Sequence, residues 1–141
     1  MDIIYKFGIA SMDFERVTAM LSQAYWSPGI KMYEMKKAAF NSALVIGAFS
    51  EEGRQIAYGR VISDKTRFAY LTDFYVDKEF RKKGICRKMV ELVMSYADLA
   101  DVYQWLLVTG DAHGLYEKCG FKVIARPHDF MEIRSPRPKD R

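Results

Sequence analysis

The sequence has few histidines and cysteines and no long apolar run. Only two histidines and two cysteines, Cys86 and Cys119, occur in 141 residues, and they form neither a metal-ligand spacing nor a disulfide framework. We therefore expect no bound metal and a reducing, cytoplasmic setting. No apolar stretch approaches the roughly 18 residues that suggest a membrane-spanning helix, and no secretory signal pattern is present, so no membrane association is expected.

The excess of positive charge is small and concentrated in one segment. The formal net charge is +4, and six of the 22 lysines and arginines lie between Lys78 and Lys88. Such a cluster fits a local anion site better than a broad nucleic-acid surface, so no nucleic-acid partner is expected. Length and composition fit a single domain over residues 1–141. Its last residues, 134–141, carry two prolines and four cations and are predicted to form a flexible tail.

Hydrophobic periodicity predicts a mixed α/β domain in the order β-α-α-β-β-β-α-β-α-β-β. Its sheet should be mostly antiparallel. A helix joins strands 67–76 and 102–108, so these two strands should be parallel neighbours in a central βαβ crossover. Ser11 is the predicted start of the first helix. The predicted strands are 3–7, 43–49, 55–62, 67–76, 102–108, 121–125 and 130–133, and the predicted helices are 12–25, 30–40, 85–96 and 112–118.

Strand 67–76 leads directly into the cationic segment. Strict alternation places Phe68, Tyr70, Thr72, Phe74 and Val76 on one face, and Ala69, Leu71, Asp73 and Tyr75 on the other.

The segment from Val76 to Met89 joins this strand to an amphipathic helix through a loop that contains Gly84. A strand that enters a helix through such a loop directs several backbone N–H groups toward one point. The helix dipole and the neighbouring cations add positive potential there. Because Gly84 has no Cβ, an anion can approach the backbone closely. The segment therefore predicts a phosphate-binding site.

Two motifs together resemble the GNAT superfamily of N-acetyltransferases. The first is Arg81-Lys82-Lys83-Gly84-Ile85-Cys86, which follows the strand and opens the helix. The second, Leu115-Tyr116-Glu117-Lys118-Cys119-Gly120-Phe121, follows some thirty residues later. The resemblance covers residues 43–125 well and the first forty weakly. The last position of the first motif is Gly or Ala in the family and Cys86 here, which should leave slightly less room for phosphate.

The resemblance implies that the ligand is acetyl-CoA. Its pyrophosphate would lie against the backbone of residues 82–87, and its pantetheine arm would pair with the strand near Phe74 and Val76. Thr109 stands where the family often has an Asn that touches the cofactor. The implied cofactor-binding residues are Phe74, Tyr75, Val76, Arg81, Lys82, Lys83, Gly84, Ile85, Cys86, Arg87, Thr109 and Tyr116.

Tyr116 and Asp73 are the candidate catalytic residues. In the family the tyrosine at the position of Tyr116 protonates the departing thiolate, a role that suits a phenol. Asp73 lies on the strand beside the expected acetyl group and could act as base or orient the amine; a structural acid that pairs with a cation or caps a bulge is an equal alternative. His113 is a further candidate base, whereas Asp111 is more simply an N-cap.

The predicted acceptor-binding residues are Tyr25, Trp26 and Asp73. The first two helices border the acceptor site in this family, which implicates Tyr25 and Trp26, and Asp73 lies on the strand beside the expected acetyl group. Arg60, Asp129 and Phe130 are weaker candidates. The predicted function is transfer of acetyl from acetyl-CoA to a primary amine of a small molecule by direct attack. The alternatives are a non-catalytic CoA-binding sensor and a protein N-terminal or lysine acetyltransferase. The resemblance also suggests a homodimer.

Overall fold

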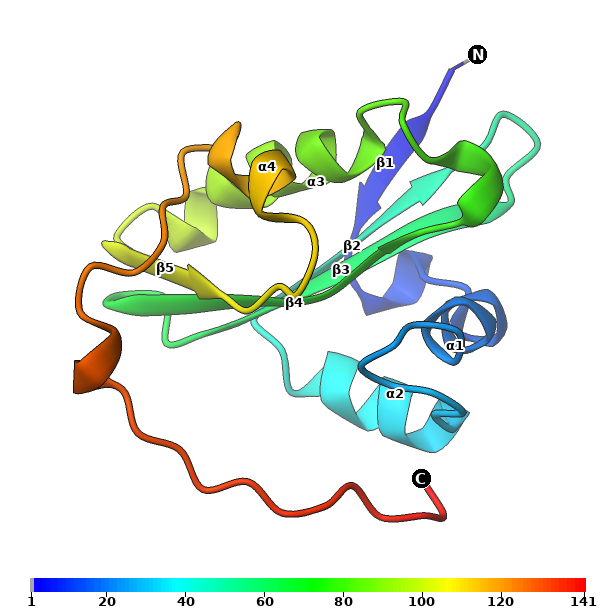
Figure 1. Cartoon of the computed structure of the whole chain (residues 1–141). Coiled ribbons are helices and arrows are strands. Elements are labelled where there is room, and N and C mark those ends of the chain that lie inside the picture. The colour runs from blue at the N-terminus through cyan, green and yellow to red at the C-terminus, as the bar shows by residue number, and fades with distance from the viewer. Residues whose placement is uncertain (1) are drawn as a thin grey trace.

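We analyse a computed structural model of the chain, in which residues 2–141 are described. Its centre is a five-stranded sheet in the order β1-β2-β3-β4-β5 (Figure 1). The pairs β1–β2, β2–β3 and β3–β4 are antiparallel, and β4–β5 is parallel. This confirms the predicted mixed sheet and the crossover. The strands are β1 Ile4–Phe7, β2 Leu44–Phe49, β3 Gln55–Ser63, β4 Phe68–Val76 and β5 Gln104–Leu107.

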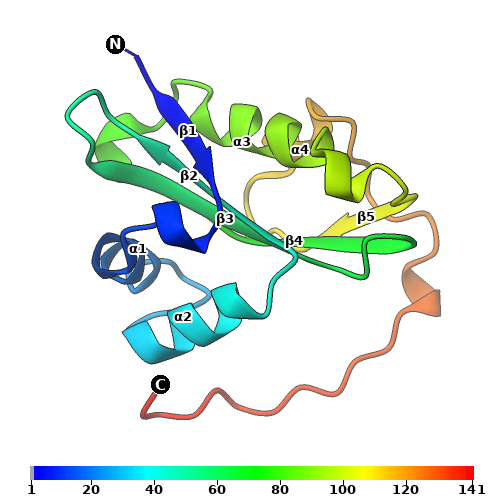
Figure 2. The ribbon, with the colours of Figure 1, turned by 180° about the vertical axis from the view of Figure 1, so that it is seen from behind.

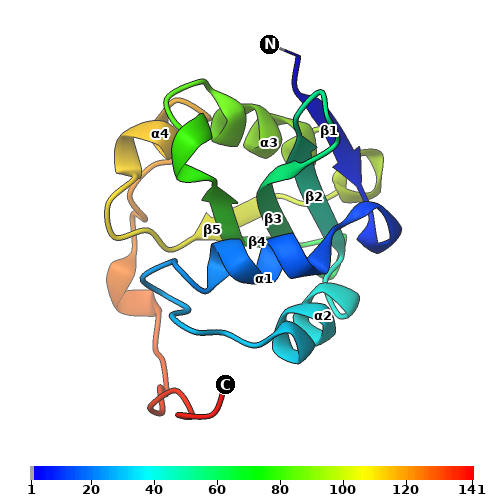
Figure 3. The same cartoon turned by 90° about the vertical axis from the view of Figure 1, so that its right-hand side faces the viewer.

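Helices cover both faces of this sheet (Figure 3). α1 (Phe14–Leu21) and α2 (Met32–Phe40) cover one face, and α3 (Ile85–Met94) and α4 (His113–Glu117) lie on the other. Four short 3-10 helices, η1 to η4, occupy Ile9–Ser11, Lys78–Phe80, Ala97–Leu99 and Pro127–Asp129. Within residues 2–141, no helix is both long and apolar enough to cross a membrane.

Two apolar cores lie on the two sides of the sheet. Met89 and Val93 of α3 pack against alternate strand residues such as Ile46, whereas Leu21 of α1 belongs to a second cluster with Tyr58. Every residue of β2 is buried, because one face of the strand meets each core. This explains the nearly continuous apolar run in this part of the sequence.

A β-bulge in β4 shifts the predicted alternation of its side chains. Tyr58 pairs with Tyr75 but Arg60 pairs with Thr72, so β4 carries one extra residue at this point. Asp73 lies in the bulge and has a φ of 59°. The extra residue returns Phe74 to the α3 side, where Leu71 also packs. The prediction that these two residues face opposite sides is therefore wrong, because strict alternation fails across a bulge.

The first helix is shorter than predicted and begins later. The prediction of Ser11 as its start is wrong, because Ser11 lies in η1 and the N-cap is Asp13, whose carboxylate accepts the Arg16 N–H at 3.2 Å. At the other end, the Ser27 hydroxyl donates to the Leu21 carbonyl at 2.7 Å. This bond folds the following loop back onto the end of the helix, so residues 22–25 do not extend it.

The two strands predicted at 121–125 and 130–133 are absent from the part of the chain that the structure describes. This segment is irregular apart from η4. Val123, Met131 and Ile133 are 78%, 96% and 100% exposed, so no packed surface holds their apolar side chains in a strand. Residues 134–141 also lack regular structure and run back toward α2 (Figure 2), where Arg141 lies 3.3 Å from Glu34.

Candidate functional site

The start of α3 has the geometry of an anion-binding site. Gly84 is its N-cap, with φ 77° and ψ 12°, and no side chain caps the helix. A Cβ at Gly84 would have nothing within 4 Å, so the space before the helix is open. Lys82 also has a positive φ, 64°. Residues with positive φ within a turn can form a concave arrangement of N–H groups that binds anions.

The first N–H groups of α3 are available to a ligand. The first backbone bond of the helix runs from the Lys88 N–H to the Gly84 carbonyl at 3.0 Å. Among residues 2–141, the N–H groups of Ile85, Cys86 and Arg87 have no hydrogen-bond acceptor. These donors and the positive end of the helix dipole together suit a phosphate or pyrophosphate group.

The predicted cationic side chains do not all face this opening. Arg81 folds back onto β4, where its Nε donates to the Val76 carbonyl at 2.9 Å and its guanidinium lies 5.1 Å from the centre of the Tyr75 ring. Lys83 lies over the ring of Phe80, at 5.9 Å. Lys82 and Arg87 are exposed, so they can contact an anion at the start of the helix.

β4 and β5 pair over only part of their length. Residues Phe68–Leu71 pair with Gln104–Leu107, and the ladder ends there although β4 continues to Val76. Beyond β5 the chain curves away toward α4 (Figure 1). The β4 backbone from Thr72 onward therefore has no β5 partner on this side. Apart from the Val76 carbonyl, which Arg81 occupies, this edge could pair with an extended ligand.

Tyr116 lies on α4, next to the start of α3. Its hydroxyl is beside the Cys86 thiol, and its ring packs edge-on against Phe121 at 6.1 Å. Burial raises the pKa of Tyr116 well above its ordinary value, and Cys86 adds to the shift. Burial also raises the pKa of Cys86 to about 11, although hydrogen bonding with Tyr116 opposes it. Both groups therefore keep their protons at neutral pH.

Asp73 is held by two neighbours. One carboxylate oxygen accepts from Arg60 Nε at 2.7 Å and the other accepts from the Trp26 indole at 3.0 Å. Arg60 in turn reaches Ser42 Oγ, 3.3 Å from its Nη1. The side chain of Asp73 is only 9% exposed. The bulge thus presents this carboxylate toward the loop that follows α1.

Tyr25 and Trp26 connect that loop to both sides of the site. Tyr25 Oη accepts from the Gly110 N–H at 3.0 Å, which links the loop to the segment between β5 and α4. Trp26 packs edge-on against Tyr25 at 4.9 Å and against Tyr75 at 6.4 Å. The two side chains are 62% and 40% exposed, so aromatic surface remains available to a ligand.

The other predicted residues lie around the start of α4 or outside this cluster. Thr109 Oγ1 accepts the Ala112 N–H at 3.0 Å, and the N-cap of α4 is Ala112, so the prediction of Asp111 as the cap is wrong. Asp129 pairs with Arg126 at 3.1 Å in an exposed segment.

Sequence reasoning missed Ser42 and Gly110. Their contacts to Arg60 and Tyr25 cross 18 and 85 residues of sequence, and no local pattern marks them. In residues 2–141, no group of three or more His, Cys, Asp or Glu side chains could hold a metal ion.

Comparisons with known proteins agree with this geometry. Residues 14–121 match the model of the Acetyltransferase (GNAT) family. A solved structure from Xanthomonas campestris pv. campestris, of a protein assigned to the GNAT family, is 34% identical with a TM-score of 0.89, over 96% of this chain and 95% of that one. No curated protein matches the chain.

Two more distant solved structures share the fold. One, from Staphylococcus aureus, is 22% identical with a TM-score of 0.74, over 95% of this chain and all of that one. Another, from Clostridium acetobutylicum and solved with acetyl-CoA, is 17% identical with a TM-score of 0.64, over 94% of this chain and 96% of that one. The family match and the Xanthomonas relative together confirm the resemblance seen in the sequence: this chain belongs to the GNAT family of acetyltransferases.

Proposed function

We propose that the protein transfers the acetyl group of acetyl-CoA to the primary amine of a small molecule. The observation that carries this proposal is the position of Tyr116, a half-buried protonated phenol, next to the open, uncapped start of α3. The GNAT family uses acetyl-CoA, and the Clostridium structure contains it. When bound, acetyl-CoA supplies an acetyl thioester as the electrophile.

The residues that would hold the donor fit its chemistry. The N–H groups of Ile85, Cys86 and Arg87 would bind the pyrophosphate, because the described chain offers them no other acceptor. The edge of β4 beyond the β5 ladder, from Thr72 to Tyr75, would pair with the amide groups of pantetheine, whereas the Val76 carbonyl already accepts from Arg81 Nε. Both groups of contacts use the backbone, so they tolerate Cys86 at a position where the family has Gly or Ala.

Tyr116 would act as the general acid. In direct attack, the amine nitrogen forms a bond to the acetyl carbon, and the carbon–sulfur bond breaks. The phenol would give its proton to the departing sulfur, and solvent or the proton released by the amine would restore it. Burial favours this role because it keeps the phenol protonated.

Asp73 would orient the acceptor amine. Both of its oxygens already accept hydrogen bonds, from Arg60 and Trp26, but each oxygen has a further lone pair for an ammonium or amine N–H. Tyr25 and Trp26 would then contact the body of the acceptor. Because Asp73 pairs with the fixed cation Arg60, we assign it to positioning rather than to removal of the amine proton.

The test measures the release of CoA thiol from acetyl-CoA with a panel of amines: amino acids, polyamines, amine antibiotics, and peptides with a free N-terminus or lysine. Turnover with a small amine, together with its acetylated product by mass spectrometry, supports the proposal. Turnover restricted to peptides would indicate a protein acetyltransferase instead. Tight CoA binding without turnover on any acceptor would indicate a sensor.

A further inference from the structure

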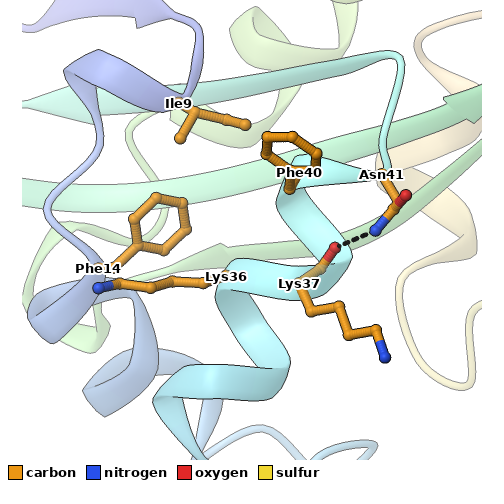
Figure 4. Close-up of a pocket in the computed structure, with 6 residues that line it drawn as sticks. All are labelled: Ile9, Phe14, Lys36, Lys37, Phe40 and Asn41. Atoms are coloured by element: carbon orange, nitrogen blue, oxygen red, sulfur yellow. Dashed lines mark hydrogen bonds between the residues drawn. The ribbon is translucent and has the colours of Figure 1, made fainter.

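A second concave site lies apart from the residues assigned above. It is a cavity of about 560 Å³ between η1, the start of α1 and the last turn of α2 (Figure 4). Its lining residues come from η1, α1 and α2, and α1 and α2 cover one face of the sheet, whereas α3 and α4, the helix that carries Tyr116, lie on the other face (Figure 3). The cavity is lined by Ile9, Phe14, Lys36, Lys37, Phe40 and Asn41.

Three apolar side chains from three elements form its walls. Ile9 comes from η1, Phe14 from the first turn of α1 and Phe40 from the end of α2, and Figure 4 shows them around one space. Phe40 is 77% exposed and Ile9 is 41% exposed. Phe40 and Ile9 therefore form exposed apolar surface beside the cavity, which a bound ligand could cover.

The two lysines of the cavity differ in direction. In Figure 4 the side chain of Lys36 extends beneath Phe14, whereas Lys37 points away from the three apolar side chains. Neither lysine forms an ion pair with any residue in 2–141. The Asn41 amide donates to the Lys37 carbonyl at 2.9 Å. Both lysines line the cavity, and Lys36 is the one whose side chain lies along the apolar wall, beneath Phe14.

We propose that this cavity binds a small amphipathic anion, an aliphatic or aromatic chain with one carboxylate. Its volume lies within the roughly 300–1,000 Å³ of small-molecule sites. A second copy of the chain would bring like-charged lysines together. Apolar burial against Ile9, Phe14 and Phe40 would supply most of the affinity, and Lys36 would select the charge.

The test is an NMR titration of the ¹⁵N-labelled full-length protein with octanoate, and with octylamine as a probe of equal chain length and opposite charge. Octanoate should give saturable shifts at the backbone amides of Ile9, Phe40 and Asn41, and octylamine should bind at least several-fold more weakly. Lys36→Gln should weaken octanoate binding several-fold. Lys37→Gln removes the same charge one residue away, so it should leave the affinity unchanged. Phe40→Ser should also weaken binding, because it removes apolar wall.

Several results would overturn the proposal. These are shifts that do not saturate, octylamine binding as tightly as octanoate, or equal effects of the two lysine substitutions. Binding to anionic phosphatidylglycerol vesicles without binding of free octanoate would assign the patch to a membrane surface and reject a small-molecule site. Since the readout is binding at this cavity, the result does not depend on acetyl transfer.

Discussion

Asp73 shows how the backbone conformation of one residue shapes this site. Its positive φ marks the bulge, and the bulge places its carboxylate between Arg60 and Trp26. A non-glycine residue in this region of φ is uncommon and costs free energy. The two hydrogen bonds offset that cost, because they satisfy both oxygens of a nearly buried carboxylate.

At the residue scale, Tyr116→Phe should lower the turnover number about 100-fold or more, because it removes the proton that the leaving sulfur requires. The dissociation constant of acetyl-CoA should stay nearly unchanged, since the ring and its packing against Phe121 remain. Steady-state kinetics and calorimetry measure the two quantities. Tyr103→Phe, at a 73% exposed tyrosine, is the matched control. Full activity of Tyr116→Phe would remove the tyrosine from the mechanism.

The pH dependence of turnover tests the same residue. An acid whose pKa is raised holds its proton to higher pH, so the active, protonated form of Tyr116 should persist beyond the usual phenol value of about 10. Activity should therefore rise as the acceptor amine loses its proton and should not fall again below about pH 10. A decline with an apparent pKa near 8 or 9 that disappears in Tyr116→Phe would contradict the raised pKa.

At the element scale, helices and strands with a clear apolar periodicity can be predicted from the sequence. Features that depend on contacts between distant residues cannot. β2 and α3 have strong apolar patterns, and their observed bounds lie within two residues of the predicted ones. The bulge at Asp73 leaves no mark in the apolar pattern. The predicted strand over 130–133 is wrong because Met131 and Ile133 have no packed surface. Apolar periodicity shows that a helix or strand has a face that could be buried. Whether that face is buried depends on the elements that pack against it.

The bulge leads to a prediction about Gly59. A Cβ at this residue would lie 2.6 Å from the ring of Phe74, which packs over it. Gly59→Ala should therefore lower the free energy of unfolding by about 1–3 kcal/mol, as overpacking of a core does. Urea denaturation measures this change. Gly114→Ala is the control, because a Cβ there has nothing within 4 Å and alanine favours the helix. Equal stability of the two variants would show that the ring of Phe74 moves aside freely.

At the scale of the whole molecule, Asp77 joins segments that are distant in the sequence. It follows β4, caps η2, and pairs with Arg16 of α1 and, at 3.9 Å, with Arg54 of the β2–β3 turn. Burial opposes its ionisation, but the Glu79 N–H and Arg16 hold the pKa of Asp77 below its usual value. The ion pairs connect α1 to the strand that leads into the start of α3.

A homodimer stays a prediction, which sedimentation analysis would check.

Asp77→Asn should lower the free energy of unfolding at pH 7 by about 1 kcal/mol, the scale of a partly exposed ion pair. Because the pKa is lower in the folded state, the carboxylate stabilises the fold above its unfolded pKa, near 4, and this contribution is lost as the pH falls through the folded value. The difference between the variant and the wild type should thus shrink below about pH 4. Urea denaturation at pH 7, 5 and 3 checks this, with Asp101→Asn as an exposed control. A difference that stays constant across this range would contradict the linkage.

Calorimetric titration with acetyl-CoA tests whether the start of α3 binds the pyrophosphate. Gly84→Glu places bulk and negative charge at that point. Gly53→Glu makes the same change at a glycine with a similar φ, 87°, and equally open surroundings, in the β2–β3 turn, which contains none of the residues assigned to the cofactor. The wild type and Gly53→Glu should bind acetyl-CoA equally, and Gly84→Glu should lose at least 100-fold in affinity, about 2.7 kcal/mol. Unchanged affinity of a folded Gly84→Glu protein would contradict pyrophosphate binding at the start of α3.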